Sequence, residues 1–265
     1  MNVEVVADLG ENPRGSLVYA LDLIEAANKV GYGAVQFGIP SLKEGVGLQE
    51  RDYLIIDEHC KAHGMEWSAT VGDVESAEFL VEFNPRWVRI EKGKAYFVEL
   101  LKYCASNFQE VRVSTEMLGW NGIKQLHKFL YNPPHIFDTG GVTEIGQELP
   151  AKRVGVIFHA GSEAQTYMGG CNLRVIERLK AVMGSERVGI GYSGNDRSDF
   201  SGAIAVSYGA SVIERVFKAG EPLYSQDGTM NLDPESAKTH IQGIREAEKL
   251  IGHSSIRERS KVVPT

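Results

Sequence analysis

Residues 188–217 read VGIGYSGNDRSDFSGAIAVSYGASVIERVF, and this stretch decides the fold class. The apolar run at 188–192 is typical of a buried strand, and the run at 212–217 predicts a second one. Between them, the segment at 201–208 is predicted as a helix. Strand, helix and strand in direct succession form a parallel βαβ unit.

The alternation extends over most of the sequence. Further strands are predicted at 3–9, 34–37, 65–69, 87–90, 111–114 and 154–159, and further helices at 16–30, 49–63, 76–83, 95–104, 122–131, 172–183 and 234–251. Eight such units in about 250 residues are what a (β/α)8 TIM barrel needs. We therefore predict an α/β fold, a single TIM barrel over residues 1–251, with a doubly wound sheet as the alternative.

Three segments interrupt this rhythm. Residues 132–149 contain Pro-Pro and Gly-Gly and are predicted as a loop inserted before the sixth strand. Residues 219–233 form a long loop after the eighth strand, at the end of the barrel where catalytic groups lie. Residues 252–265 are predicted as a polar C-terminal tail.

Composition excludes several classes of protein. The net charge of −7 argues against a nucleic-acid or anionic-membrane partner. The three cysteines lie far apart without a CxxC pair, which favours reduced thiols and excludes a cysteine-based zinc site. No signal-peptide pattern opens the chain, and no apolar run approaches 18 residues. We expect a cytoplasmic protein that acts on a small molecule.

Polar residues follow the predicted strands, where a TIM barrel builds its active site. They are Asp8, Asn12, Gln36, Ser68, Arg89, Lys92, Ser114, His159, Ser162, Ser193, Asn195, Glu214 and Asp227. Carboxylates, hydroxyls and two cations at one mouth favour a phosphate or carboxylate site, with Arg89 as the forked donor. The alternative is that half of them are rim residues without a role in binding. For His159, a structural role and a site role are equally open.

Two other patterns carry less weight. Gly189, Gly191 and Gly194 match GxGxxG, but the following helix begins only near Ser201, which disfavours a nicotinamide-dependent oxidoreductase. His59 and His63 are four residues apart and share a helix face. Without a third ligand they are predicted as a solvated helix surface.

Several segments carry a resemblance to a known family. They are "ADLGEN" (7–12), "AVQF" (34–37), "HGMEWSAT" (63–70), "STEM" (114–117), "HAGS" (159–162), "CNLRVIERLK" (171–180), "VGIGYS" (188–193), "GASVIERVFK" (209–218) and "LDPES" (232–236). Their order and spacing resemble the barrel domain of the sialic acid synthases. These enzymes condense phosphoenolpyruvate with an N-acylated hexose through a divalent metal. We expect the family's C-terminal antifreeze-like domain to be absent, and we expect a homodimer.

The resemblance also implies site residues. It implies Asp8, Glu214 and Asp227 as catalytic residues, and Gln36, Arg89, Lys92, Ser114, Ser162, Ser193 and Asn195 as substrate or anion contacts. Gln36 stands where the family has a phosphate-binding lysine, and Asn195 and Val216 stand at its two metal-binding histidines. We therefore expect no tightly bound metal, with weak Mg²⁺ binding at Asp8 and Asp227 still open. The predicted function is a sialic-acid-synthase-like condensation or a diverged relative of it. The alternative is a catalytically silent paralogue that binds a small anionic metabolite or a partner protein.

Overall fold

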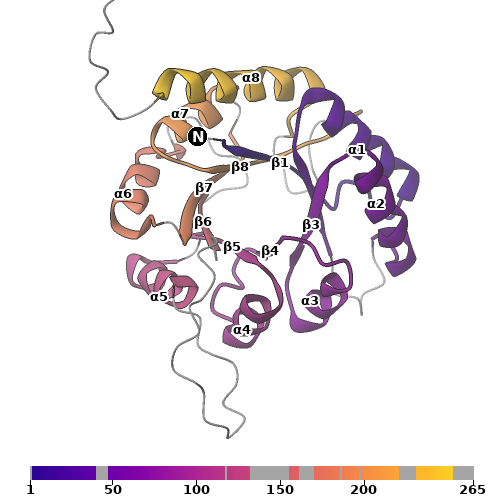
Figure 1. Ribbon diagram of the computed structural model, residues 1–265, viewed down its shortest axis with the longest axis horizontal. Coiled ribbons are helices and arrows are strands. Elements are labelled where there is room, and N and C mark those ends of the chain that lie inside the picture. The colour runs from indigo at the N-terminus through magenta and orange to yellow at the C-terminus, as the bar shows by residue number, and fades with distance from the viewer. Residues whose placement is uncertain are drawn as a thin grey trace, which may run out of the picture.

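A computed structural model describes residues 2–39, 47–116, 118–131, 155–160, 170–185, 187–196, 198–220 and 231–252. Within these residues eight parallel strands close into a barrel in sequence order, because β8 pairs with β1 as well as with β7. Helices alternate with the strands and surround the barrel (Figure 1). This closed barrel confirms the predicted TIM-barrel fold and excludes the doubly wound sheet.

The bounds of the elements agree closely with the predicted ones. The strands are β1 (Glu4–Gly10), β2 (Ala34–Gly38), β3 (Glu66–Val71), β4 (Trp87–Ile90), β5 (Glu110–Ser114), β6 (Gly155–Ala160), β7 (Val188–Gly194) and β8 (Val212–Val216). The helices are α1 (Leu17–Val30), α2 (Glu50–Ala62), α3 (Val74–Val81), α4 (Val98–Asn107), α5 (Trp120–Tyr131), α6 (Arg174–Met183), α7 (Ser201–Ser207) and α8 (Pro234–Ile251).

Capping explains where several helices begin and end. α3 begins two residues earlier than predicted because the Asp73 carboxylate accepts a hydrogen bond from the Ser76 amide at 2.8 Å. Asp233 caps α8 in the same way, followed by Pro234 in the first turn. α1 ends at Gly31, whose φ of 101° is the left-handed conformation that glycine adopts without strain.

Alternation along the strands divides the apolar residues between two cores. One face of each strand packs against the surrounding helices, and Ile24, Ile56 and Ile213 are fully buried there. The opposite face points into the barrel. A small apolar layer fills its middle, formed by Val6, Ala34, Trp87, Val156, Phe158 and Val212. This layer separates the two ends of the barrel interior.

Charged residues fill the end of the barrel where the strands begin. We call Glu4, Glu66, Arg86, Glu110 and Arg112 the base cluster. The guanidinium of Arg112 lies 2.6 Å from Glu4 Oε1 and 2.7 Å from Glu110 Oε1, and its plane covers the Trp87 ring at 3.8 Å. Arg86 Nη2 lies 2.9 Å from Glu4 and 2.7 Å from Glu66. Every carboxylate of this cluster has a cationic partner.

A second buried ion pair lies where β8 packs against α7. Arg215 and Asp196 are both fully buried, with Nη1 and Oδ2 3.5 Å apart. Arg215 also donates to the Ser201 hydroxyl at 2.8 Å, and the Tyr192 hydroxyl donates to Asp196 at 2.6 Å. These bonds tie the segment after β7 to the start of α7, so they hold one rim of the mouth in place.

Some predicted segments fall outside the described residues. They include the insertion at 132–149, most of the loop after β8 and the tail beyond residue 252. Cys60, Cys104 and Cys171 are buried and form no disulfide, in agreement with reduced thiols. Within the described part of the chain, no helix has the length and hydropathy required to span a membrane.

Candidate active site

The carboxyl ends of the strands bring together five of the predicted site residues. Arg89 of β4 reaches Glu214 of β8, with 3.2 Å between Nε and Oε2. Ser193 of β7 donates to Glu214 Oε1 at 3.1 Å. Gln36 of β2 is paired in register with Asp8 of β1, and its side chain hydrogen-bonds to that carboxylate. We call Asp8, Gln36, Arg89, Ser193 and Glu214 the mouth cluster.

Asp8 is the carboxylate whose acidity the mouth changes most. Burial, followed by repulsion from the Glu214 carboxylate, raises the pKa of Asp8 to about 7. Arg89, the Gln36 side chain and the Gly10 amide, which donates to Asp8 at 3.1 Å, oppose this rise without cancelling it. A carboxyl group with this pKa holds or releases a proton near neutral pH, as a general acid or base must.

Several polar atoms of the mouth cluster have no hydrogen-bond partner among the described residues. They are Gln36 Oε1, Arg89 Nη1 and Glu214 Oε2, all buried. A buried polar atom without a partner costs about 1–3 kcal/mol, so such atoms are rare where no ligand binds. The amide oxygen of Gln36 and Nη1 of Arg89 are thus available to a ligand, whereas Glu214 Oε2 is already ion-paired with Arg89 Nε at 3.2 Å.

The floor of the mouth is aromatic and depends on a glycine. The Arg89 guanidinium lies over the Phe158 ring, with 4.5 Å between Arg89 Cζ and the ring centroid. This is a cation–π contact. Gly191 is the register partner of Phe158, and a Cβ at position 191 would lie 2.6 Å from that ring. Gly191, one member of the GxGxxG match, is therefore a packing residue. α7 begins only at Ser201, so no helix opens at the third glycine as a dinucleotide site requires.

Other predicted contacts lie around this cluster. Ser114 ends β5 and accepts from the Glu116 amide at 3.2 Å. Lys92 Nζ lies 2.5 Å from Glu116 Oε1, so this cation is paired with Glu116. Asn195 directly follows β7 and is half-buried. Ser162 and Asp227 lie outside the described residues.

His159 lies on the outer side of its strand. It alternates with Phe158, which faces the barrel interior, and its Nε2 donates to the Cys171 carbonyl at 2.8 Å. Its ring also stacks on Tyr192. Burial lowers the pKa of His159, and the hydrogen bond to the Cys171 carbonyl opposes this without cancelling it. Of the two roles open from the sequence, the contacts are those of a structural histidine.

Asn195 and Val216, which stand where the family has its metal-binding histidines, are poorly suited to hold a transition-metal ion. Val216 ends β8 in register with Asp8 and offers no ligand atom, and Asn195 offers one neutral oxygen. In the described part of the chain, the one group of three histidine, cysteine or acidic side chains close enough to hold an ion lies elsewhere, on α1 and α2. These two described positions are therefore poor ligands for a transition-metal ion.

Sequence reasoning missed part of this arrangement. The base cluster was not predicted, and neither was the support that Phe158 gives to Arg89. Phe158 looks in sequence like any other apolar strand residue. Its alternation with His159 was the signal available, since only one of two neighbours can face the barrel interior.

Comparison with known proteins gives a consistent relationship. The NeuB family profile matches residues 28–255. N,N'-diacetyllegionaminic acid synthase of Legionella pneumophila is 24% identical over 100% of this chain and 77% of its own length. N-acetylneuraminate-9-phosphate synthase of Drosophila melanogaster is 25% identical over 92% of this chain and 67% of its own length.

A solved structure shares the fold. The crystal structure of N-acetylneuraminic acid (sialic acid) synthetase from Leptospira borgpetersenii serovar Hardjo-bovis in complex with citrate superposes with a TM-score of 0.81. It is 20% identical and covers 98% of this chain and 88% of the other. The barrel is common to both proteins, and the family match spans most of this sequence. The resemblance seen in the sequence is confirmed: the chain belongs to the NeuB family.

Proposed function

We propose that this protein is a sugar-acid synthase that condenses phosphoenolpyruvate with an N-acylated sugar at the mouth cluster. The single observation that carries the proposal is the coupling of Asp8, with its pKa raised to about 7, to the Arg89–Glu214 pair. The relatives named as legionaminic acid and N-acetylneuraminate-9-phosphate synthases support the choice of substrates.

The proposed reaction joins two carbons and releases phosphate. The methylene carbon of phosphoenolpyruvate bonds to the aldehyde carbon of the open-chain sugar, whose oxygen takes up a proton. Water adds at the carbon that bears the phosphate oxygen, inorganic phosphate leaves, and a 2-keto acid forms. Protonated Asp8 is suited to supply the proton to the aldehyde oxygen, because its carboxyl is half-protonated near pH 7.

The anionic substrate needs cationic and polar contacts. We assign its carboxylate or phosphate to Arg89 Nη1, which has no hydrogen-bond partner among the described residues. Gln36, Ser114, Ser193 and Asn195 are proposed to add neutral hydrogen bonds, and Lys92 would join them by leaving Glu116. Asp227 and Ser162 keep the roles that the sequence resemblance implies.

No step of this scheme passes through a metal ion, because Val216 and Asn195 do not fit one. We propose that any Mg²⁺ held by Asp8 and Asp227 binds weakly and depends on substrate oxygens. Restoring both histidines, in Asn195→His with Val216→His, should raise manganese affinity. Calorimetric titration of the parent and the double variant measures this, and equal affinities would mean that position 216 is not beside the metal position.

A second function is favoured by the presence of Asn195 and Val216 where the family has its two metal-binding histidines. A catalytically silent paralogue would retain the anion-binding mouth without the Lewis acid that its relatives' chemistry uses. Phosphate release from phosphoenolpyruvate, measured with N-acetylmannosamine and related N-acyl sugars, separates the two functions. Release that requires both substrates supports the synthase. No release with any sugar, together with measurable phosphoenolpyruvate binding, supports the silent binder.

A further inference from the structure

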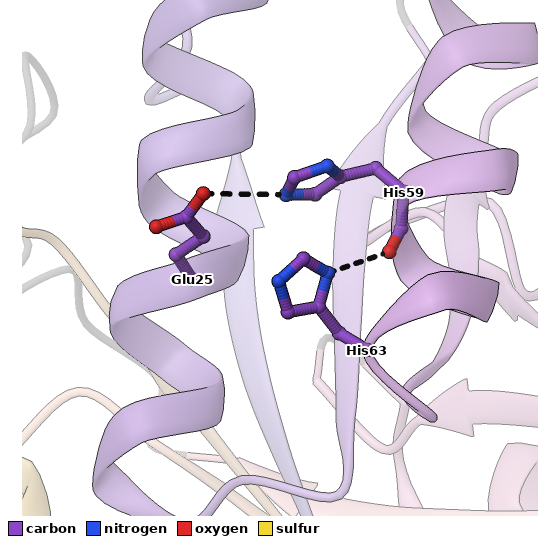
Figure 2. A group of neighbouring side chains, drawn as sticks. All are labelled: Glu25, His59 and His63. Atoms are coloured by element: carbon purple, nitrogen blue, oxygen red, sulfur yellow. Dashed lines mark hydrogen bonds and ion pairs between the residues drawn. The ribbon is translucent and has the colours of Figure 1, made fainter.

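A group of metal-ligating side chains lies on the outside of the barrel, between α1 and α2. Figure 2 shows His59 and His63, from the last turn of α2 and the residue that caps it, facing Glu25 on α1. Helices of a TIM barrel run antiparallel to the strands, and β3 begins three residues after His63. The group therefore lies toward the base of the barrel, at the end opposite the mouth.

The structure corrects the expectation of a solvated helix surface for His59, whereas His63 is exposed as expected. The His59 side chain is only 21% exposed, and its Nε2 lies 3.8 Å from Glu25 Oε1. Its Nε2 is buried and has no hydrogen-bond partner among the described residues. The two imidazole rings are 4.4 Å apart between centroids. Glu25 on the neighbouring helix α1 supplies the third ligand that the spacing along α2 did not indicate.

The orientation of His63 prepares it for coordination. Its Nδ1 lies 2.9 Å from the His59 carbonyl oxygen, which can only accept, so Nδ1 carries the proton and donates. The Nε2 of the same ring is then left with a free lone pair. A second hydrogen bond of this kind fixes the tautomer and the direction of metal-binding histidines in general.

The distances suit a small tetrahedral ion. One ligand atom from each of Glu25, His59 and His63 lies within 4.8 Å of the other two. Tetrahedral zinc, with bonds of about 2.0–2.1 Å, places its ligands about 3.3 Å apart. The 3.8 Å between His59 and Glu25 needs a contraction of about 0.5 Å, and a pair at the 4.8 Å limit needs about 1.5 Å. The half-buried Glu25 side chain and the exposed His63 ring therefore have to move toward the ion.

The surrounding charges leave the group accessible to a cation. Lys29 is the nearest competitor, with Nζ 3.6 Å from Glu25 Oε2, but its side chain is 77% exposed and free to move away. Lys61 on the same helix is engaged by Asp57 at 2.6 Å. Cys60, between the two histidines in sequence, is fully buried in the core and cannot join them.

We propose that Glu25, His59 and His63 bind a divalent transition-metal ion, preferentially Zn²⁺, which clips α1 to α2. Two imidazoles and one carboxylate favour zinc over magnesium or calcium, and water completes the fourth position. An ion that binds only the folded chain raises its stability as the ion concentration rises. The site is independent of the proposed synthase reaction because it lies at the other end of the barrel.

The test is a zinc titration of untagged protein that has been dialysed against a chelator. We expect saturable binding of one equivalent, an unfolding temperature that rises with zinc, and visible absorption of a tetrahedral ion when Co²⁺ is used. Glu25→Gln, His59→Gln and His63→Gln should each weaken binding at least by the roughly 10- to 100-fold that the loss of an outer partner costs. Lys29→Gln should tighten binding, since it removes the competing cation.

Two matched variants control for charge and for histidine content. Glu58→Gln removes an exposed carboxylate from the same helix α2, and His127→Gln removes a histidine from α5. Both should bind zinc like the parent. The proposal is overturned if zinc does not bind saturably at micromolar concentration, or if the three ligand variants bind as well as the two controls. Circular dichroism confirms that each variant is folded.

Discussion

The two ends of the barrel interior hold the same kinds of side chain in opposite electrostatic states. Glu4 and Asp8 both point inward from β1, four residues apart. Burial alone would raise the pKa of Glu4, but ion pairs with Arg112 and Arg86 outweigh it and lower that pKa. At Asp8, burial and the neighbouring Glu214 prevail and raise the pKa to about 7.

The two ends differ in the number of arginines that contact each carboxylate. At the base, two arginines serve Glu4, Glu66 and Glu110, and Arg112 is shared in close contacts. At the mouth, Arg89 is the cation that lowers the pKa of Asp8, and the same Arg89 pairs with Glu214. A carboxylate in contact with two arginines, such as Glu4, stays ionised and stabilises the fold, whereas two carboxylates that share one arginine retain a proton that can be used in chemistry.

The largest effect on activity should follow from removing the titratable carboxyl group of Asp8. Asp8→Asn keeps the shape of the side chain but cannot release or accept a proton. We expect phosphate release from phosphoenolpyruvate and sugar to fall about 10²- to 10⁴-fold, as general acid–base residues typically contribute. Steady-state kinetics measure it, and Asp57→Asn on α2 serves as the control. Activity within a factor of three of the parent would remove Asp8 from the reaction.

The next effect concerns the base. Arg112→Met leaves the buried Glu110 without its close partner and Glu4 with Arg86 alone, which should cost about 3–5 kcal/mol in the free energy of unfolding. Urea denaturation measures the loss. The double variant Glu110→Gln with Arg112→Met should recover part of it. Phosphoenolpyruvate affinity of the folded fraction should not change, and a large change would mean that the two ends are coupled.

The pH dependence of stability should have opposite signs at the two carboxylates. Asp8 binds more protons in the folded than in the unfolded state between about pH 4 and 7, so its contribution to stability falls as pH rises. Asp8→Asn should therefore gain about 0.5–2 kcal/mol over the parent at pH 8 and almost nothing at pH 4.

Glu4 supplies the contrast. Its lowered pKa contributes stability that is present above its ordinary value and is lost on acidification, so Glu4→Gln should lose most at neutral pH. Unfolding free energies measured from pH 4 to 8 should thus diverge for the two variants as pH rises. Parallel curves would show that the two ends do not differ in the way described.

The smallest effect is expected at the rim. Lys92 is 55% exposed in its pair with Glu116, so Lys92→Gln should change the free energy of unfolding by less than about 1 kcal/mol. Thermal denaturation at low and high salt checks this. The same variant tests the proposed anion contact, because a rise in KM for phosphoenolpyruvate is expected if Lys92 leaves Glu116 for the substrate.

The sequence was sufficient for the fold because every strand is a short apolar run followed by a helix. It also located the mouth, since Asp8, Arg89 and Glu214 lie toward the carboxyl ends of strands that a barrel must bring together. The partnership of Arg89 with Glu214 could not be predicted. It joins β4 to β8 across the barrel, and no local pattern encodes such a contact.

The base cluster and the proposed zinc site of Glu25, His59 and His63 could not be predicted either, because both depend on contacts between residues far apart in the sequence. Glu4 and Arg112 are 108 residues apart, and charged residues at strand starts look in sequence like solvated ends. Glu25 lies on a different helix from His59, so spacing along α2 alone suggested two ligands and no site. In both cases the missing information is which elements become neighbours once the barrel closes.

The lack of a side chain at Gly191 affects the position of a residue that it does not contact. Gly191 leaves room for the Phe158 ring, and that ring supports Arg89 from below. A methyl group added at 191 would displace the ring, and the guanidinium would have to follow or lose its support. A substitution at position 191 would therefore move Arg89, the residue proposed to bind the substrate, from a position that does not contact the substrate itself.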